Sequence, residues 1–272
     1  MKEMFRLKAA SAEDLAAFHE NGYVAFPAVL TDEGQQGLLD EILSREQIVD
    51  FLSQTDEERS KLNNPYRFSI RPWSNKGQWG EKLFDAPFVT HLLRATIGEA
   101  FHFCHSTLHI SVRGARPLPF HQDNKPVNLA EKQKWYIQML YYPNGFKRGD
   151  ASLAVIPGSH FISSWGEHEP YGPRGATPEQ LTELYGEQVG REFQEEHLDL
   201  PPGSMVFLNA KTFHAVRPKP SDSPQEFRLF VNYIFKEPGA PLRNTQVIPP
   251  EWIQRASPER RKLFQREAYS KA

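Results

Sequence analysis

The chain has 272 residues, of which 39% are hydrophobic and 24% are charged, so it can form one globular domain with a sizeable core. Its formal net charge is only −2, which gives no electrostatic reason to expect a nucleic acid or an anionic membrane as partner. The single cysteine, Cys104, excludes an intrachain disulfide, and the charged start MKEMFRLK lacks the apolar segment of a secretory signal. We therefore expect a cytoplasmic protein that acts on a small molecule, and we leave its oligomeric state open.

Helical patterns occupy the first hundred residues. A helix is predicted over 11–21, with Ser11 as its N-cap and an Asn-Gly pair that ends it before a short strand, YVAFP. A second helix begins after its N-cap, Thr31, and a third is predicted over 87–97. The polar stretch from about 44 to 80 is predicted to be a long loop, and such loops are often functional.

Strand patterns dominate from residue 101 onward. In FHFCHSTLHISVR, apolar and polar residues alternate, which puts Leu108 on one face and Thr107 and His109 on the other. Further strands are predicted in WYIQMLYYP, SLAVIPGSH, GSMVFLNA and FRLFVNYIF, and 161–197 is predicted to be a loop-rich insertion with a helix near 178–188. Strands that follow helices in this way predict a mainly β fold, an antiparallel barrel or jelly roll with flanking helices.

These patterns indicate a single domain over residues 1–272. Its helical N-terminal part would cover 11–100, its jelly-roll core about 101–236 and its C-terminal tail 237–272. The tail is predicted to form one or two exposed helical turns or a docking segment.

Two potential metal ligands lie in the segment PFHQDN. His121 and Asp123 are two residues apart, so in an extended chain both side chains point to the same face. His214 follows the Gly-led strand GSMVFLNA and is the best candidate for a third ligand, if that strand runs antiparallel beside the first. Two histidines and one carboxylate occupy one face of an octahedron and leave the opposite face open, which favours Fe(II) and oxygen activation.

An arginine on the last predicted strand fits the co-substrate of such a site. In FRLFVNYIF, Arg228 shares one strand face with Phe230 and Asn232, and this face is predicted to look into the barrel. A buried guanidinium binds a carboxylate through two parallel hydrogen bonds, as the distal carboxylate of 2-oxoglutarate requires. Two alternatives stay open: an ion pair between Arg228 and Glu226 at a strand edge, and a co-substrate site built on Arg217.

Other polar and aromatic residues are further candidates for the same cavity. Three polar strand residues could hold 2-oxoglutarate, although each could equally be an ordinary hydrogen-bonded core group: Thr107, His109 and Gln138. Four residues of the early loop and the insertion could bind the substrate, although each could simply pack its own loop: Tyr66, Arg67, Trp73 and Trp165.

Four segments, in the same order, resemble the phytanoyl-CoA dioxygenase family. LAAFHENGYVAFPAVLTDEGQQGLLDEIL resembles its opening helices and Asn-Gly-Tyr turn, FHQDN its His-x-Asp motif, LAVIPGSH its Pro-Gly-Ser-His segment, and PPGSMVFLNAKTFHAVRP the strand with its distal histidine. The resemblance covers about residues 11–236 and implies a double-stranded β-helix core (jelly-roll, cupin-like), with Fe(II) held by His121, Asp123 and His214. It also implies 2-oxoglutarate and O₂ as co-substrates, and usually hydroxylation of a small organic molecule with decarboxylation of 2-oxoglutarate to succinate and CO₂.

The sequence departs from the family pattern around the distal histidine. The spacing from His214 to Arg228 is longer than the family leads us to expect, through PKPSDSP, and Val216 stands where a serine or threonine is common. Asp123 favours hydroxylation or a related oxidation over halogenation, because related halogenases have a small residue in place of this carboxylate. The alternative function is a metal-binding jelly-roll protein without redox chemistry. Neither the substrate nor the choice between hydroxylation, desaturation, cyclisation and endoperoxidation follows from the sequence.

Overall fold

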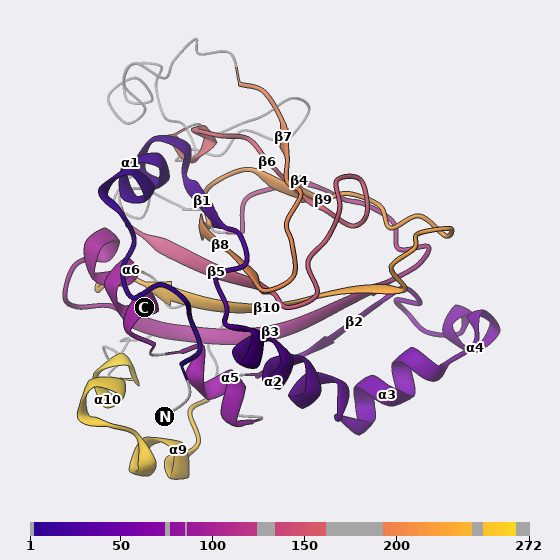
Figure 1. Ribbon diagram of the computed structural model, residues 1–272, viewed down its shortest axis with the longest axis horizontal. Coiled ribbons are helices and arrows are strands. Elements are labelled where there is room, and N and C mark those ends of the chain that lie inside the picture. Colours follow the sequence, from indigo (N-terminus) through magenta and orange to yellow (C-terminus); the bar gives the residue numbers. More distant parts are fainter. Residues whose placement is uncertain are drawn as a thin grey trace, which may run out of the picture.

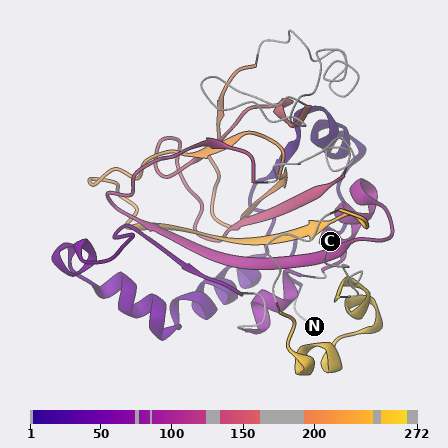
Figure 2. The same cartoon turned by 180° about the vertical axis from the view of Figure 1, so that it is seen from behind.

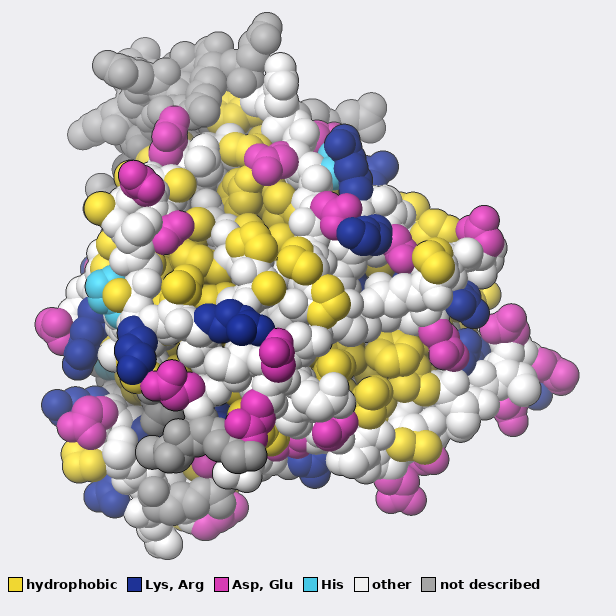
Figure 3. Space-filling view, in the orientation of Figure 1, with side chains coloured by type: hydrophobic (Ala, Val, Ile, Leu, Met, Phe, Trp, Pro, Cys, Tyr) yellow, Lys and Arg dark blue, Asp and Glu magenta, His cyan; other side chains and the backbone are white. Residues whose placement is uncertain are grey.

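Two antiparallel sheets form the body of the protein, with helices on the outer face of the larger one (Figure 1). The computed structural model describes residues 3–73, 77–84, 86–123, 134–161, 193–240 and 247–264. Within these ranges, no helix is long and apolar enough to cross a membrane. On the face shown in Figure 3, the described Lys and Arg side chains are interspersed with Asp and Glu, so charges of one sign do not dominate that face.

The larger sheet contains six strands in the order β1-β8-β5-β10-β3-β2, and the smaller one four in the order β4-β9-β6-β7. The larger sheet consists of β1 (Tyr23–Phe26), β8 (Ser204–Asn209), β5 (Tyr136–Tyr142), β10 (Phe227–Lys236), β3 (His102–Val112) and β2 (Arg67–Ile70). The smaller sheet consists of β4 (Leu118–His121), β9 (His214–Val216), β6 (Leu153–Val155) and β7 (Glu196–His197). The two views in Figures 1 and 2 show the smaller sheet stacked over the larger one, as in a jelly roll.

Each face of the larger sheet contributes to a different core. Alternate residues of its strands, such as Leu108, Ile110 and Leu229, pack with the helices in the main hydrophobic cluster. The opposite face contributes residues such as Leu140 and Leu208 to a second cluster between the two sheets. The alternation seen in the sequence thus separates a helix-covered face from a face that looks between the sheets.

The N-terminal helices begin where the sequence predicts. Helix α1 (Ala12–Asn21) has Ser11 as its N-cap in a capping box with Asp14, and α2 (Asp32–Leu43) is capped by Thr31. Helix α6 (Pro87–Ile97) starts with a proline, whose fixed φ suits a first helical turn.

The prediction of a long loop between about 44 and 80 was wrong. This stretch contains α3 (Glu46–Ser53), α4 (Asp56–Ser60), β2 and α5 (Gln78–Lys82). Helix α3 buries Ile48 and Phe51 at a spacing of three residues. Because these elements are only four to eight residues long, their periodicity is too short to stand out in a polar sequence.

The C-terminal segment docks on the main core. Helices α9 (Pro250–Arg255) and α10 (Pro258–Phe264) lie beneath the larger sheet in Figure 1. The fully buried Trp252 packs against Phe84, with ring centroids 5.5 Å apart. The described part of the tail therefore combines the two predicted forms, because it contains two short helices and docks through Trp252.

The candidate metal centre

The three predicted ligands converge at one end of the smaller sheet. His121 is the last residue of β4 and His214 the first residue of β9, and the two are direct partners across this antiparallel pair. Asp123 follows β4 by two residues. The ligand atoms of all three side chains lie within 4.8 Å of one another. The route to this geometry differs from the sequence prediction, because the Gly-led strand β8 belongs to the larger sheet and the chain changes sheets before His214.

Both imidazoles present Nε2 to the same carboxylate. Nε2 of His121 is 3.4 Å from Oδ1 of Asp123, and Nε2 of His214 is 3.6 Å from Oδ2. On the other side of each ring, Nδ1–H donates to a backbone carbonyl: His121 to Pro119 at 2.8 Å and His214 to Thr212 at 2.9 Å. Because a carbonyl can only accept, these bonds select the tautomer whose Nε2 lone pair points toward a metal.

The carboxylate is held ready to act as an anionic ligand. Burial would raise the pKa of Asp123, but the adjacent side chains of His121 and His214 outweigh it and hold that pKa well below its usual range. Gln138 donates from Nε2 to Oδ2 of Asp123, and its Oε1 accepts a 2.8 Å hydrogen bond from Asn232. Gln138, predicted as a contact to 2-oxoglutarate, thus orients the carboxylate ligand through a chain that reaches β10.

The turn between α1 and β1 supports the distal histidine. Gly22 adopts φ +75°, which glycine tolerates without strain, and a Cβ there would collide with Thr212. The hydroxyl of Thr212 donates to the carbonyl of Gly22 at 2.9 Å, while its own carbonyl accepts from His214. The Asn-Gly turn of the sequence therefore positions a candidate metal ligand nearly 200 residues further along the chain.

A cavity of about 220 Å³ extends from the three ligands between the two sheets. Its charged lining residues, within the described chain, are Arg67, Asp123 and Arg228. Burial, followed by the charge of Arg228, lowers the pKa of the lining residue His109 to about 4, so its ring is neutral at physiological pH. The ring of His109 stacks on Phe230 with centroids 4.7 Å apart.

Arg228 points a buried guanidinium at this cavity. Its side chain is only 2% exposed, and Nε and Nη1 have no hydrogen-bond partner among the described residues. Its guanidinium lies 4.8 Å from the ring centroid of Phe230, a cation–π distance. Burial lowers its pKa to about 10, which leaves it charged. Because a buried, unpaired charge is costly, the geometry fits an anion that supplies the missing acceptors, and the ion pair with Glu226 does not form.

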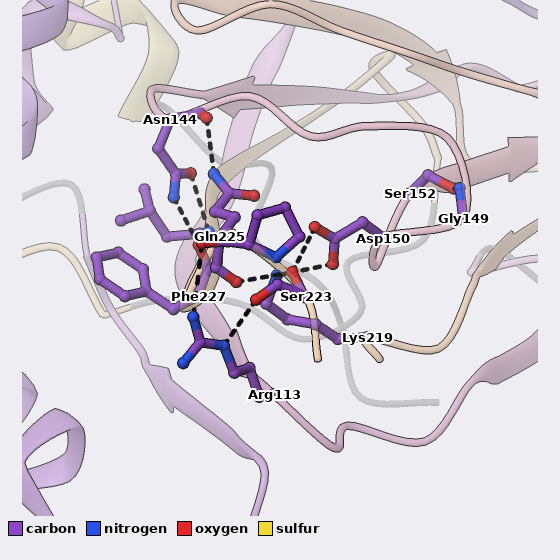
Figure 4. A network of polar contacts seen from close by, with 11 residues as sticks. Arg113, Asn144, Gly149, Asp150, Ser152, Lys219, Ser223, Gln225 and Phe227 are labelled. Atoms are coloured by element: carbon purple, nitrogen blue, oxygen red, sulfur yellow. Dashed lines mark hydrogen bonds and ion pairs between the residues drawn. The ribbon is translucent and has the colours of Figure 1, made fainter. Parts of the chain in front are cut away.

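A buried polar network anchors the segment that separates His214 from Arg228 (Figure 4). Lys219, whose side chain is fully buried, donates to Asp150 at 2.8 Å and to Ser223 at 3.0 Å, and Ser223 donates to the second oxygen of Asp150 at 2.6 Å. Burial lowers the pKa of Lys219, and the hydrogen bond that Lys219 donates to Asp150 opposes that shift. The extra residues PKPSDSP therefore form a fixed loop, with Lys219 and Ser223 as its anchors.

The remaining predicted residues lie in different places. Thr107 is buried opposite Asn232 but is not among the residues that line the cavity. Trp73 is fully buried in the main hydrophobic cluster and Tyr66 packs against that cluster, so neither placement favours substrate contact. Arg67 does line the cavity. Trp165 and the helix predicted near 178–188 lie outside the described residues.

Sequence reasoning did not single out several lining residues. They include Ser111, Leu140 and Tyr142. Ser111 is on the same face of β3 as His109, so the alternation of polar and apolar residues in that strand could have predicted that Ser111 lines the cavity. The position of Tyr142 in the cavity depends on how β5 pairs with β8 and β10, and short-range sequence patterns do not contain this pairing.

A facial arrangement of two histidines and one carboxylate, at the rim of a jelly roll, defines a non-haem metal centre with positions left for other ligands. The family model for phytanoyl-CoA dioxygenase (PhyH) matches residues 18–227, and the chain belongs to this family. No match was found among curated proteins.

Solved structures share the fold at low sequence identity. HygX from Streptomyces hygroscopicus, with nickel and 2-oxoglutarate bound, is 14% identical with a TM-score of 0.59, and the match covers 85% of this chain and 88% of that one. The epimerase SnoN, in complex with Fe³⁺, alpha ketoglutarate and nogalamycin RO, is 14% identical with a TM-score of 0.59, covering 88% and 96%. EvdMO1 is 17% identical with a TM-score of 0.57, and the match covers 84% of this chain but only 50% of EvdMO1. Family membership and the site together identify an enzyme of the 2-oxoglutarate-dependent oxygenase type.

Proposed function

We propose that the protein hydroxylates a small organic molecule, with Fe(II) bound by His121, Asp123 and His214 and with 2-oxoglutarate bound through Arg228. The observation that carries this proposal is the buried guanidinium of Arg228, whose Nε and Nη1 lack acceptors among the described residues, in the same cavity as the three ligands. A binding protein without redox chemistry would have no use for the three metal ligands and this costly charge together. When bound, iron with 2-oxoglutarate and O₂ would supply the oxidising power, and 2-oxoglutarate would leave as succinate and CO₂.

Each residue of the proposed site has a separate role. His121 and His214 donate Nε2 lone pairs, and their Nδ1–H bonds fix the rings. Asp123 keeps the third position occupied, which favours transfer of oxygen over transfer of halide. Arg228 sets the direction of the co-substrate and thereby the side on which the substrate approaches. The two sheets and the stacked rings of His109 and Phe230 form part of the wall of this space and limit its contact with water.

Binding of metal and co-substrate can be tested without knowing the substrate. Under anaerobic conditions, adding 2-oxoglutarate to the Fe(II)-loaded protein should produce a weak metal-to-ligand absorption band in the visible range. Asp123→Ala should lose the band because iron is no longer held. Arg228→Met should retain iron but require at least about tenfold more 2-oxoglutarate, because a charge-assisted hydrogen bond contributes about 1.5–3 kcal/mol.

Arg217→Met is the matched control. Arg217 is half-buried in the turn after His214 and does not line the cavity, so its loss should leave the affinity for 2-oxoglutarate unchanged. An unchanged affinity in Arg228→Met, or a larger loss in Arg217→Met, would move the co-substrate site away from Arg228. Hydroxylation itself is tested with ¹⁸O₂: one labelled oxygen in the oxidised substrate supports it, and an unlabelled, desaturated or cyclised product contradicts it.

A further inference from the structure

Two arginines and a serine form one row across the larger sheet. In the register of β2, β3 and β10, both Arg67 and Arg228 are paired with Ser111. Cross-strand partners share a face of the sheet, and all three residues line the metal cavity. Because neighbouring strands are about 4.8 Å apart, the Cα atoms of the two arginines are separated by only about 10 Å.

Neither guanidinium of this row forms an ion pair within the described chain. Arg67 donates from Nη2 to the backbone carbonyl of Arg116, which fixes its direction but brings no negative charge. Burial lowers the pKa of Arg67, and the charge of Arg67 in turn helps to lower the pKa of Arg228. The two arginines therefore repel each other across the cavity, and both remain charged.

When the proposed Fe(II) and 2-oxoglutarate are bound, the positive charge of one of these two arginines remains uncompensated. The two positive charges of Fe(II) and the charge of Arg228 are cancelled by Asp123 and the two carboxylates of 2-oxoglutarate. Among the other titratable lining residues, His109 is neutral because burial lowers its pKa to about 4, and Tyr142 is neutral because burial raises its pKa to about 12. The charge of Arg67 is then unbalanced in a partly desolvated site, which favours a further anion.

Arg67 also borders a second, outer space. A groove of about 710 Å³ lies beside the edge strand β2 and α3, and Arg67 is the one described residue common to its lining and that of the metal cavity. The inner cavity, at about 220 Å³, is below the range of about 300–1,000 Å³ usual for small-molecule sites, whereas the groove lies within it. The inner cavity can thus hold 2-oxoglutarate and the reacting end of a substrate, with the rest outside.

The groove is suited to a polar, negatively charged group. Its described lining includes a second arginine, Arg71, and several amide side chains, while Asp50 is its only acidic residue. The aromatic rings of Phe51 and Phe68 stack in its wall with centroids 5.1 Å apart. Within its described lining, the groove therefore combines apolar surface with amide donors and the guanidinium of Arg67.

We propose that the substrate carries a carboxylate or phosphate group, which Arg67 binds at the boundary between the groove and the metal cavity. This inference rests on the proposed function, since the charge balance assumes Fe(II) and 2-oxoglutarate. It deepens that function by naming the substrate class and the residue that selects it. Arg228 serves the co-substrate and Arg67 the substrate, although both belong to one row of the sheet.

The test uses inorganic phosphate as the probe, with butyrate and its neutral amide as a matched pair. The protein, labelled with ¹⁵N-arginine, is loaded with redox-inert Zn(II) in place of Fe(II) and saturated with 2-oxoglutarate. The Nε–Hε signal of Arg67 should shift in a saturable manner with phosphate and butyrate but not with butyramide. The signal of Arg228 should stay in place, because 2-oxoglutarate already occupies it. In uniformly ¹⁵N-labelled samples of the wild-type protein and Arg67→Gln, the phosphate affinity is followed at the amide of Ser111 and should be at least about tenfold lower in the variant.

Arg94→Gln is the control variant. Arg94 is exposed on α6 and belongs to neither lining, so its loss should leave the phosphate affinity unchanged. The inference is overturned if Arg67 responds no more than Arg94 does, or if butyramide shifts Arg67 as butyrate does. It is also overturned if Arg67→Gln weakens 2-oxoglutarate binding as much as Arg228→Met, which would assign both arginines to the co-substrate. Failure of the wild-type protein to bind Zn(II) and 2-oxoglutarate would instead contradict the proposed function, and the phosphate titration can then be read on the metal-free protein.

Discussion

The fixed loop between His214 and Arg228 allows a quantitative prediction about Lys219. Replacing Lys219 by methionine keeps a side chain that matches lysine up to Cε but leaves Asp150 without its cation. Removing one partner of a buried ion pair costs about 3–5 kcal/mol. The carboxylate of Asp150 is 12% exposed and keeps its hydrogen bond from Ser223. We therefore expect the lower end, a loss of about 3 kcal/mol in the free energy of unfolding.

Thermal and urea unfolding of the metal-free protein measure this loss. For a chain of this size, 1 kcal/mol corresponds to about 2–4 °C, so Tm should fall by about 6–12 °C. Lys147→Met is the control: its ion pair with Asp199 has similar chemistry, but the lysine side chain is 80% exposed, and exposed pairs contribute at most about 1 kcal/mol. The affinity for 2-oxoglutarate should also fall in Lys219→Met, because the loop leads directly into β10 and Arg228.

A double variant separates pairing from packing. Asp150→Asn combined with Lys219→Met removes the unpaired charge, so its destabilisation should be smaller than the sum of the single losses by at least about 1 kcal/mol. If Lys219→Met unfolds like Lys147→Met, or if the losses are additive, the network does not stabilise the loop and the reasoning fails.

Three further predictions concern the site itself. Gln138→Leu removes the hydrogen bond to Asp123 and should weaken metal binding by about 10- to 100-fold, as measured by competition with a chelator; unchanged affinity would mean that this bond does not orient the ligand. Gly22→Ala should lower both stability and metal affinity, because the added Cβ displaces the loop that holds His214; loss of stability alone would contradict this coupling. The metal-free protein should lose stability as the pH falls from 6.5 to about 4, since unfolded His109 accepts a proton that the folded site disfavours, and His109→Gln should show a shallower decline in pH-dependent urea unfolding.

Short-range patterns in the sequence were sufficient for much of the fold. Capping residues Ser11 and Thr31 and the alternation in β3 and β10 predicted their elements, because caps and strand alternation depend on neighbouring residues. The jelly-roll fold and the family membership are also confirmed. The stretch from about 44 to 80 was mispredicted because its helices and strand are stabilised mainly by what they pack against.

Some features of the candidate site likewise follow from local sequence, and others only from the tertiary structure. The separation of His121 from Asp123, and the face shared by Arg228 and Asn232, are local properties of extended chains, and the sequence by itself determined them. Only the tertiary structure placed His214 opposite His121, through a change of sheet that no local pattern indicates. It also brought Arg67 into one row with Arg228, because strand register depends on pairings between residues far apart in the sequence, here Ser111 with Arg67 and Ser111 with Arg228.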